Sequence, residues 1–226
     1  MKKNILSIFT LFCCLLATSS CNYDNFDEPK SMFTGRATYD GESVNISSNG
    51  RVQFNIFQDG FGKYDPIPVY LNQDGEFSAT LFDGNYKLVR MGNAPWERPS
   101  NDTIRFSVHG NTALDIPVIP YFIIKDATFS KEGSKVKATF KIKKVSESAT
   151  LKDVCLYIGK TLITSSYTNI GITSLGNSVA MDTELKAEID IPSNMENEGF
   201  IYARIGVHSN QASEACYTKS TKIELK

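Results

Sequence analysis

The residue types that most often carry catalysis are scarce in this chain. Its 226 residues include two histidines, His109 and His208, and five cysteines. Neither histidine sits in a motif that pairs it with a nucleophile, and the serine of "GNSVAM" lacks the G-x-S-x-G turn of serine hydrolases. The sequence contains no CxxC, HExxH or P-loop pattern, which would indicate redox, metal or nucleotide chemistry. We therefore predict a non-enzyme that needs no metal and no cofactor.

The first three cysteines belong to an export leader and its end. Two lysines at positions 2 and 3, an apolar stretch over 5–17 and small residues near position 20 are typical of a signal peptide at residues 1–20. The apolar stretch is shorter than the roughly 20 residues that a membrane-spanning helix needs. Cleavage before Cys21 would make its thiol the first mature residue. The segment "LLATSSC" resembles the bacterial lipobox, with Thr18 at the leucine position, and the resemblance implies a lipid anchor on Cys21.

Two cysteines remain in the exported part, Cys155 and Cys216. Disulfides form in oxidising compartments outside the cytoplasm, so we predict that this pair is a candidate disulfide. Both cysteines lie in strand-like runs far apart in the sequence, and two separate buried thiols are the alternative.

The elements that must position any site are β-strands. Alternating segments recur with turn residues between them, such as Leu185, Ala187, Ile189 and Ile191 facing one side of a single run. Pro117 and Pro120 remove backbone donors and mark a boundary. The sequence thus predicts an all-β chain of two antiparallel β-sandwich domains in series, at 32–119 and 120–226, after a tether at 21–31.

Aromatic residues on two loops are the best candidates for binding. The loop at 91–102 holds the only tryptophan, Trp96, followed by Glu97 and Arg98 and flanked by prolines that stiffen the backbone. An exposed indole there could stack on a sugar ring, with the two charged residues as hydrogen-bonding partners. In the alternative, Trp96 packs over the end of a sandwich or between the domains. The loop at 57–68 carries two further candidates, Phe61 and Tyr64.

A run of glycines and apolar residues in the first domain resembles the prealbumin-like, or carboxypeptidase-regulatory-like, sandwich. The residues of this run are Gly75, Phe77, Leu81, Gly84, Tyr86 and Leu88. With the lipobox and the "IPVIPYF" junction, the whole chain resembles a Bacteroidetes family of two-domain outer-membrane lipoproteins of unknown function. The resemblance implies a prealbumin-like domain followed by an immunoglobulin-like or fibronectin-like one. It also implies an association with loci that encode glycan uptake through a TonB-dependent transporter.

Two short motifs resemble signals of the same phylum. The acidic residues after the lipobox, Asp24, Asp27 and Glu28, resemble the signal that sends lipoproteins to the cell surface. The tripeptide at 102–104 resembles an O-glycosylation motif, with Thr103 as the acceptor.

The formal net charge of −1 and the lack of a basic bias predict no nucleic-acid partner. Our leading hypothesis is a non-catalytic, cell-surface lipoprotein of the outer membrane that binds carbohydrate or holds a transporter partner. A fimbrial subunit that polymerises by strand exchange is the alternative hypothesis. A glycan-acting enzyme is the third.

Overall fold

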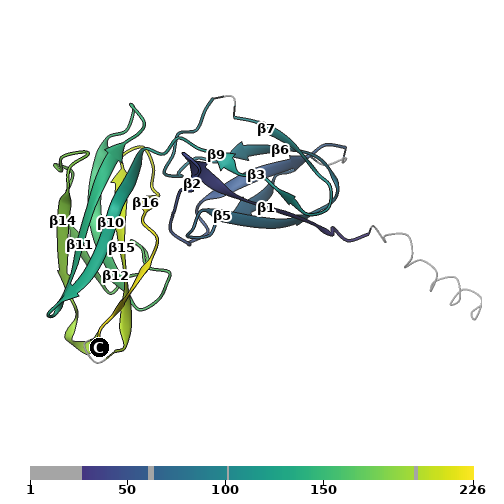
Figure 1. The fold of residues 1–226 in the computed structure, drawn as a ribbon. Helices are drawn as coiled ribbons and strands as arrows, with labels where there is room; N and C mark the ends of the chain where they lie inside the picture. Colours follow the sequence, from purple (N-terminus) through teal and green to yellow (C-terminus); the bar gives the residue numbers. More distant parts are fainter. Residues whose placement is uncertain (1–26, 61–63, 101, 196–197) are drawn as a thin grey trace, which may run out of the picture.

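The structure is a computed structural model that describes residues 27–60, 64–100, 102–195 and 198–226. It contains two β-sandwiches in series, as predicted, and each is built from antiparallel sheets (Figure 1). The N-terminal sandwich also has two short parallel pairings to its first strand. Three predicted residues, Cys21, Asp24 and Phe61, lie outside the described residues. Within the described residues, no helix has the length and apolar character needed to cross a membrane.

The N-terminal sandwich packs a sheet of order β2-β1-β5, extended by β8 and β9 on β1, against a sheet of order β4-β3-β6-β7. Its strands are β1 (Ser31–Tyr39), β2 (Glu42–Ser43), β3 (Gln53–Gln58), β4 (Ile67–Tyr70), β5 (Glu76–Leu81), β6 (Gly84–Arg90), β7 (Ile104–Val108), β8 (Thr112–Ala113) and β9 (Ile116–Pro117). Every second residue of β3 is buried, so Phe54 and Ile56 reach the core that lies between the sheets.

The turn before β5 shows why glycine is needed there. Gly75 has a φ of 74°, and a Cβ atom at this position would lie 2.4 Å from the carbonyl oxygen of Val44. Both the backbone conformation and the close approach exclude other residues. The turn before β5 therefore depends on Gly75.

The C-terminal sandwich packs a sheet of order β10-β11-β14 against a sheet of order β13-β12-β15-β16, with β17 also pairing with β15. Its elements are β10 (Phe122–Glu132), β11 (Lys135–Lys144), β12 (Leu151–Gly159), β13 (Gly171–Ser174), β14 (Leu185–Asp190), the 3₁₀ turn η2 (Ser193–Met195), β15 (Phe200–Ser209), β16 (Cys216–Tyr217) and β17 (Thr221–Glu224). Buried and less buried residues alternate along β11. Its apolar residues are buried, whereas Lys135 and Lys137 form ion pairs on the outer face.

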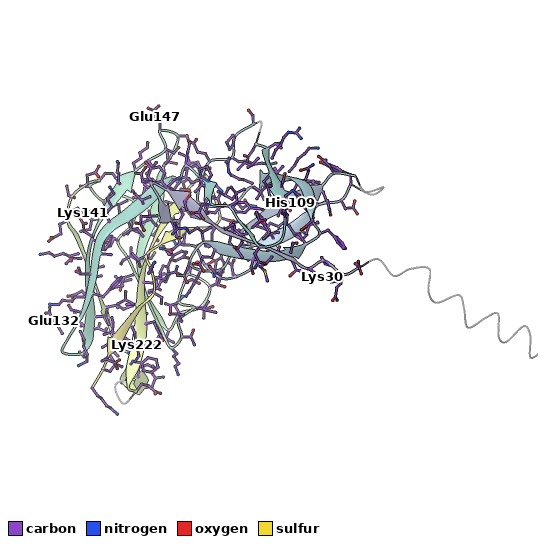
Figure 2. The ribbon with its side chains drawn as sticks, turned by 45° about the vertical axis from the view of Figure 1, so that its right-hand side comes forward. Lys30, His109, Glu132, Lys141, Glu147 and Lys222 are labelled. Atoms are coloured by element: carbon purple, nitrogen blue, oxygen red, sulfur yellow. The ribbon has the colours of Figure 1, made fainter. Side chains whose placement is uncertain are left out.

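The arrangement of the two sandwiches places the start of β1 far from the C-terminus (Figure 1). The end of the N-terminal sandwich that carries β2 and β9 abuts the C-terminal sandwich near β10 and β16 (Figure 1). The chain enters β1 at the opposite end, where Lys30 is labelled in Figure 2, and Glu132 and Lys222 lie near the far end of the C-terminal sandwich. Anything attached to the N-terminal tether is thus separated from the domain junction by the length of the first sandwich.

Candidate functional site

Trp96 is a structural residue and does not form an exposed platform. Its side chain is 2 % exposed, and its ring centroid lies 6.3 Å from that of Phe54 in the N-terminal core. Its backbone bridges to Pro120 at the start of the second domain. The prediction of a sugar-stacking tryptophan is therefore wrong, and the alternative of packing at the end of the sandwich is correct. Burial of a large aromatic ring is strongly favourable compared with leaving it in water, so Trp96 packs against the apolar core.

Glu97 and Arg98 separate in the structure. The carboxylate of Glu97 accepts hydrogen bonds from the hydroxyls of Ser146 and Ser148 in the C-terminal domain. Its backbone N–H donates to the carbonyl of Ile119 at 2.9 Å. Glu97 therefore links the two domains, whereas Arg98 is exposed. The predicted ligand-binding group of residues around Trp96 does not form.

A buried arginine joins the two domains from the C-terminal side. Arg204 on β15 is 0 % exposed. Its Nη2 atom donates to the carbonyl oxygens of Ile46 at 3.0 Å and Gln73 at 3.1 Å, both in the N-terminal domain. Nε and Nη1 donate to the carbonyls of Thr218 at 2.6 Å and Thr164 at 3.3 Å.

Among the described residues, no carboxylate forms an ion pair with Arg204. The guanidinium instead lies 4.7 Å from the ring centroid of Tyr217. Burial lowers the pKa of Arg204 to about 10. Four carbonyl dipoles and one aromatic face therefore hold a charge that the interior would otherwise disfavour.

A second buried charged residue closes the same junction. The carboxylate of Glu214 accepts from the backbone N–H of Ser47 at 3.0 Å and from Nδ2 of Asn49 at 3.4 Å. Burial raises its pKa above the usual 4.5, although these hydrogen bonds oppose the shift. The backbone N–H of Tyr217 also donates to the carbonyl of Asn45 at 2.9 Å. The junction is thus fixed by bonds from both sides of the interface.

Next to this junction lies a cavity of about 430 Å³ between the domains. One wall comes from β10, where Ile124, Ala127 and Phe129 are half-buried. The facing wall comes from the end of β1 and from β2, with Tyr39 and Ser43. Cavities of this size at domain interfaces, with mainly apolar walls, are typical binding sites for small molecules.

The rim of the cavity carries polar groups from both domains. Asp40 and Glu42 stand on the N-terminal side, and Lys125 and Lys219 on the C-terminal side, all four exposed. Asn45 also lines the cavity, and its Oδ1 atom is buried without a hydrogen-bond partner among the described residues. Buried polar atoms are rarely left unpaired, so this oxygen marks a place in the cavity wall where a donor is missing.

A β-bulge shapes the wall that β10 contributes. The pairing of β10 with β11 shifts between Lys125 and Thr128, and Asp126 has a φ of 54°. The Lys141 Nζ atom donates to the Asp126 carboxylate at 2.9 Å and holds the bulge in place. Bulges bend an edge strand and interrupt its row of backbone hydrogen-bonding groups, which protects it from pairing with another strand.

Of the predicted aromatic candidates that lie within the described residues, Tyr64 is at the surface. It is 51 % exposed and lies near Pro29, since its neighbour Asp65 shares a surface hollow with Pro29 and Gln58. The loop of Tyr64 is therefore at the tether end of the N-terminal sandwich. The loop of Trp96 is at the domain junction, so the two candidate loops lie at opposite ends of the domain.

The predicted disulfide between Cys155 and Cys216 is wrong, because both residues are free, buried thiols. Cys155 pairs opposite Gly206 of β15, whereas Cys216 pairs opposite the next residue, Val207. Successive residues of a strand point to opposite faces, so the two thiols lie on opposite faces of one sheet.

Cys155 lies close to a histidine and an acid, but the geometry does not suit catalysis. Its Sγ atom donates to Asp153 at 3.2 Å, while His208 Nε2 bonds to the hydroxyl of Tyr157 at 2.7 Å. Burial raises the pKa of the Cys155 thiol to about 11, so the thiol stays protonated at neutral pH. A nucleophilic cysteine requires the opposite shift.

The remaining predicted residues lie at the surface. Thr103 is exposed, and the carboxylate of the preceding Asp102 is held by Arg90 Nη1 at 2.5 Å. Asp27 and Glu28 are exposed at the start of the described chain. Among the described residues there is no group of three or more His, Cys, Asp or Glu side chains that could hold a metal ion.

Sequence reasoning missed the residues that join the domains and line the cavity. In "FIYARIGVHS", alternation assigns Arg204 to the outer face, which looks like solvent. The one available signal was the composition of this face of the strand. Its other residues, Tyr202, Gly206 and His208, are not typical neighbours of an exposed arginine.

Comparisons with known proteins cover almost all of the described part of the chain. Residues 31–119 match the family described as "Protein of unknown function (DUF3823) N-terminal domain", and residues 122–222 match "Domain of unknown function (DUF3823_C)". No curated protein matches the chain.

Solved structures of DUF3823 family proteins are similar over the same range. One from Bacteroides ovatus is 50 % identical with a TM-score of 0.84, and the match covers 87 % of this chain and 100 % of that one. One from Parabacteroides merdae is 34 % identical with a TM-score of 0.80, covering 88 % and 100 %.

A third structure, a Bacteroides uniformis protein named "putative carbohydrate binding protein", has a TM-score of 0.73. It is 18 % identical, with 88 % of this chain and 100 % of that one covered, so it shows a shared fold. From the matches to both of its domains and the 50 % identity over a complete relative, the chain belongs to the DUF3823 family, whose function is unknown.

Proposed function

We propose that this chain is a non-catalytic, lipid-anchored protein of the outer-membrane surface that binds carbohydrate in the interdomain cavity and serves a glycan-uptake system. The observation that carries the proposal is the cavity itself. It has apolar walls, polar groups from two domains at its rim, and an unpaired buried oxygen on Asn45.

The chemistry of the cavity matches that of a neutral saccharide. A sugar ring presents apolar C–H faces, for which Ile124, Phe129 and the ring of Tyr39 offer contact. Sugar hydroxyls both donate and accept hydrogen bonds, and the rim offers carboxylate acceptors and ammonium donors. The rim has two acidic and two basic side chains, so its formal charge is balanced and a neutral ligand is favoured.

The junction prepares the cavity for binding. Arg204 and Glu214 fix the walls relative to each other through bonds that cross the domain interface. Walls that are already in place do not need to be ordered when a ligand arrives, so less of the contact free energy is lost.

The position of the cavity also supports a role at the cell surface. The tether joins the end of the N-terminal sandwich that lies away from the cavity (Figure 1). A lipid on Cys21 would therefore hold the cavity away from the membrane, where a glycan can reach it. Tethering raises the effective concentration of a weak binder near a transporter of the TonB-dependent class. The B. uniformis protein, named for carbohydrate binding, shares the fold and lends further support.

The fimbrial alternative lacks a comparable observation. Strand exchange needs a free, regular edge, and the edge of β10 is interrupted by the bulge at Asp126. Similarly, an enzyme would need an activated group, and the Cys155 thiol is held protonated.

A binding experiment with a cavity-filling variant tests the proposal. The exported chain from residue 22 onward would be screened against neutral oligosaccharides, and hits measured by calorimetry. Ser43→Tyr places a large ring in the cavity, and we expect it to weaken binding at least tenfold. Ser130→Tyr, an exposed position further along β10 that does not line the cavity, is the control and should bind as the unmodified chain does.

Three results would overturn the proposal. One is the absence of binding to any neutral saccharide, and another is equal binding by Ser43→Tyr. New reducing ends after incubation with polysaccharides would show catalysis instead. Protease treatment of intact cells tests the surface location, since a protein facing the periplasm would survive it.

A further inference from the structure

The ring of Tyr64 is exposed yet held in one orientation. It stacks on Phe57 of β3 with ring centroids 5.2 Å apart and an interplanar angle of 23°. Lys87 of β6 donates to the Tyr64 hydroxyl at 3.1 Å. Phe57 and Lys87 are cross-strand partners, so both support the ring from the sheet. The side chain is nevertheless 51 % exposed, so part of the ring remains open to solvent, with the Lys87 Nζ atom 5.2 Å from the ring centroid.

A ring fixed in this way is prepared for stacking. An exposed tyrosine normally samples several rotamers and loses that freedom on binding. Here the supporting contacts have already removed it, so a flat ligand would meet a preformed surface. The axial C–H groups of a pyranose ring form such a surface.

The charges beside Tyr64 favour an anion. Lys87 donates to the Asp59 carboxylate at 2.7 Å, so its charge is matched. The pKa of Asp59 lies below its usual value, chiefly because of the hydrogen bond from Lys87, with further lowering by the charges of Lys87 and Arg105. Arg105 lies opposite Lys87 in the ladder and is exposed. Within the described part of the chain, no carboxylate lies within ion-pairing distance of Arg105, so the cluster has one excess positive charge.

Another cationic surface offers a useful contrast. The outward lysines of β11 are matched by acids, as in the pairs Lys135–Glu188 at 2.5 Å, Lys137–Glu132 at 2.5 Å and Lys141–Asp126 at 2.9 Å. A face whose charges are paired in this way has little attraction left for an acidic polymer. The guanidinium of Arg105, by contrast, is free to form a bidentate pair with a carboxylate.

We propose that the surface formed by Tyr64, Phe57, Lys87, Asp59 and Arg105 is a second saccharide site, separate from the interdomain cavity, that binds a sugar residue bearing a carboxylate. The ring of a uronic acid stacks on the exposed part of the Tyr64 ring, and its carboxylate pairs with Arg105. Lys87 and Asp59 orient the tyrosine and bond to sugar hydroxyls. The site lies at the tether end of the N-terminal sandwich and does not depend on the function proposed for the cavity.

The test compares one acidic oligosaccharide with its neutral form. Calorimetry would use oligogalacturonate and the same oligosaccharide with its carboxylates methyl-esterified. We expect the unmodified chain to bind the acidic form at least tenfold more tightly, with an affinity that falls as salt is raised. Tyr64→Ala should weaken binding of the acidic form at least tenfold, and Arg105→Gln should remove the preference over the ester.

Three variants serve as controls. Tyr64→Phe keeps the stacking ring and should retain most of the affinity. Tyr70→Ala removes a tyrosine of β4, in the sheet that supports Tyr64; Tyr70 is 52 % exposed but distant along the strands from the Tyr64 cluster, and its removal should have no effect. Ser43→Tyr blocks the cavity and should leave binding of the acidic form unchanged.

The proposal is overturned if the ester binds as tightly as the acid, or if Tyr64→Ala binds as the unmodified chain does. It is also overturned if Ser43→Tyr abolishes binding of the acid, because the acid would then occupy the cavity. Each of these results is independent of whether neutral sugars bind in the cavity. Thermal unfolding of every variant verifies that a lost affinity does not reflect a lost fold.

Discussion

Removal of the Arg204 side chain should uncouple the two domains. Arg204→Ala leaves the carbonyl oxygen of Ile46 in the N-terminal domain without its donor, and those of Thr164 and Thr218 in the C-terminal domain as well. The carbonyl of Gln73 loses one of its two donors and keeps the backbone N–H of Ile46 at 3.0 Å. The substitution also removes a side chain that is 0 % exposed and the ring contact with Tyr217. The effect should therefore fall mainly on the interface.

The magnitude follows from these contacts. A buried acceptor that loses its partner costs about 1–3 kcal/mol, so the carbonyls of Ile46, Thr164 and Thr218 together amount to about 3–9 kcal/mol. Two effects reduce this value. Water can enter the space left behind, and the desolvation cost of the buried guanidinium, visible in its lowered pKa, disappears. We expect a net loss of about 3 kcal/mol in the free energy of unfolding.

Urea denaturation followed by two probes measures this loss. Trp96 is the only tryptophan and lies at the junction on the N-terminal side, so its fluorescence reports that domain. Far-ultraviolet circular dichroism reports both domains. In the unmodified chain the two curves should coincide, whereas in Arg204→Ala they should separate into two transitions.

The matched control is Arg51→Ala. The guanidinium of Arg51 lies 4.8 Å from the ring of Tyr167, also across the interface, but Arg51 is exposed. An exposed contact of this kind contributes about 0.5–1 kcal/mol, so this variant should unfold in one transition at nearly the original midpoint. If Arg204→Ala behaved in the same way as Arg51→Ala, the view of Arg204 as the residue that couples the domains would be refuted.

Three further predictions concern buried groups. Burial raises the pKa of Glu214 above 4.5. Between pH 4.5 and this raised pKa, the folded chain keeps a proton that the unfolded chain has lost. The free energy of unfolding therefore falls as pH rises through this range. Glu214→Gln should therefore match the unmodified chain near pH 4 and gain stability relative to it by pH 8; a difference that stays constant with pH would contradict this. Trp96→Ala should lower the free energy of unfolding by about 3–5 kcal/mol, measured by circular dichroism, while any sugar affinity of the folded fraction is unchanged. Cys155 and Cys216 should react with a thiol reagent only after denaturation, and a lack of reaction even then would indicate a disulfide.

The fold could be predicted from the sequence because each strand carries its own signal. In β11, for example, alternation alone identifies Val136 and Phe140 as core residues, and both are buried. Turn glycines such as Gly75 mark where strands end, since few other residues adopt a positive φ. These features are local, so one sequence suffices to find them.

The site could not be predicted in the same way, because it depends on which surfaces meet. Trp96 and Glu97 sit on a polar, proline-rich loop that looks exposed until the second domain covers it. Arg204 occupies an outward position of β15, and alternation does not reveal that another domain lies above this face. The prediction of a disulfide failed for a related reason. The register that places Cys155 and Cys216 on opposite faces depends on how the strands pair in the sheet, and no single strand reveals it.

The fixed domain junction at Arg204 also limits how far the interdomain cavity can move from a membrane anchor. With the domains fixed, the distance from the first strand to the interdomain cavity is constant, and only the tether can change its length. If Cys21 carries the anchor, the ten residues from Cys21 to Lys30 extend to at most about 36 Å. The height of the cavity above the membrane would then vary only with the extension of this tether. The orientation of the cavity would follow that of the N-terminal sandwich, so a partner that binds this sandwich would also orient the cavity.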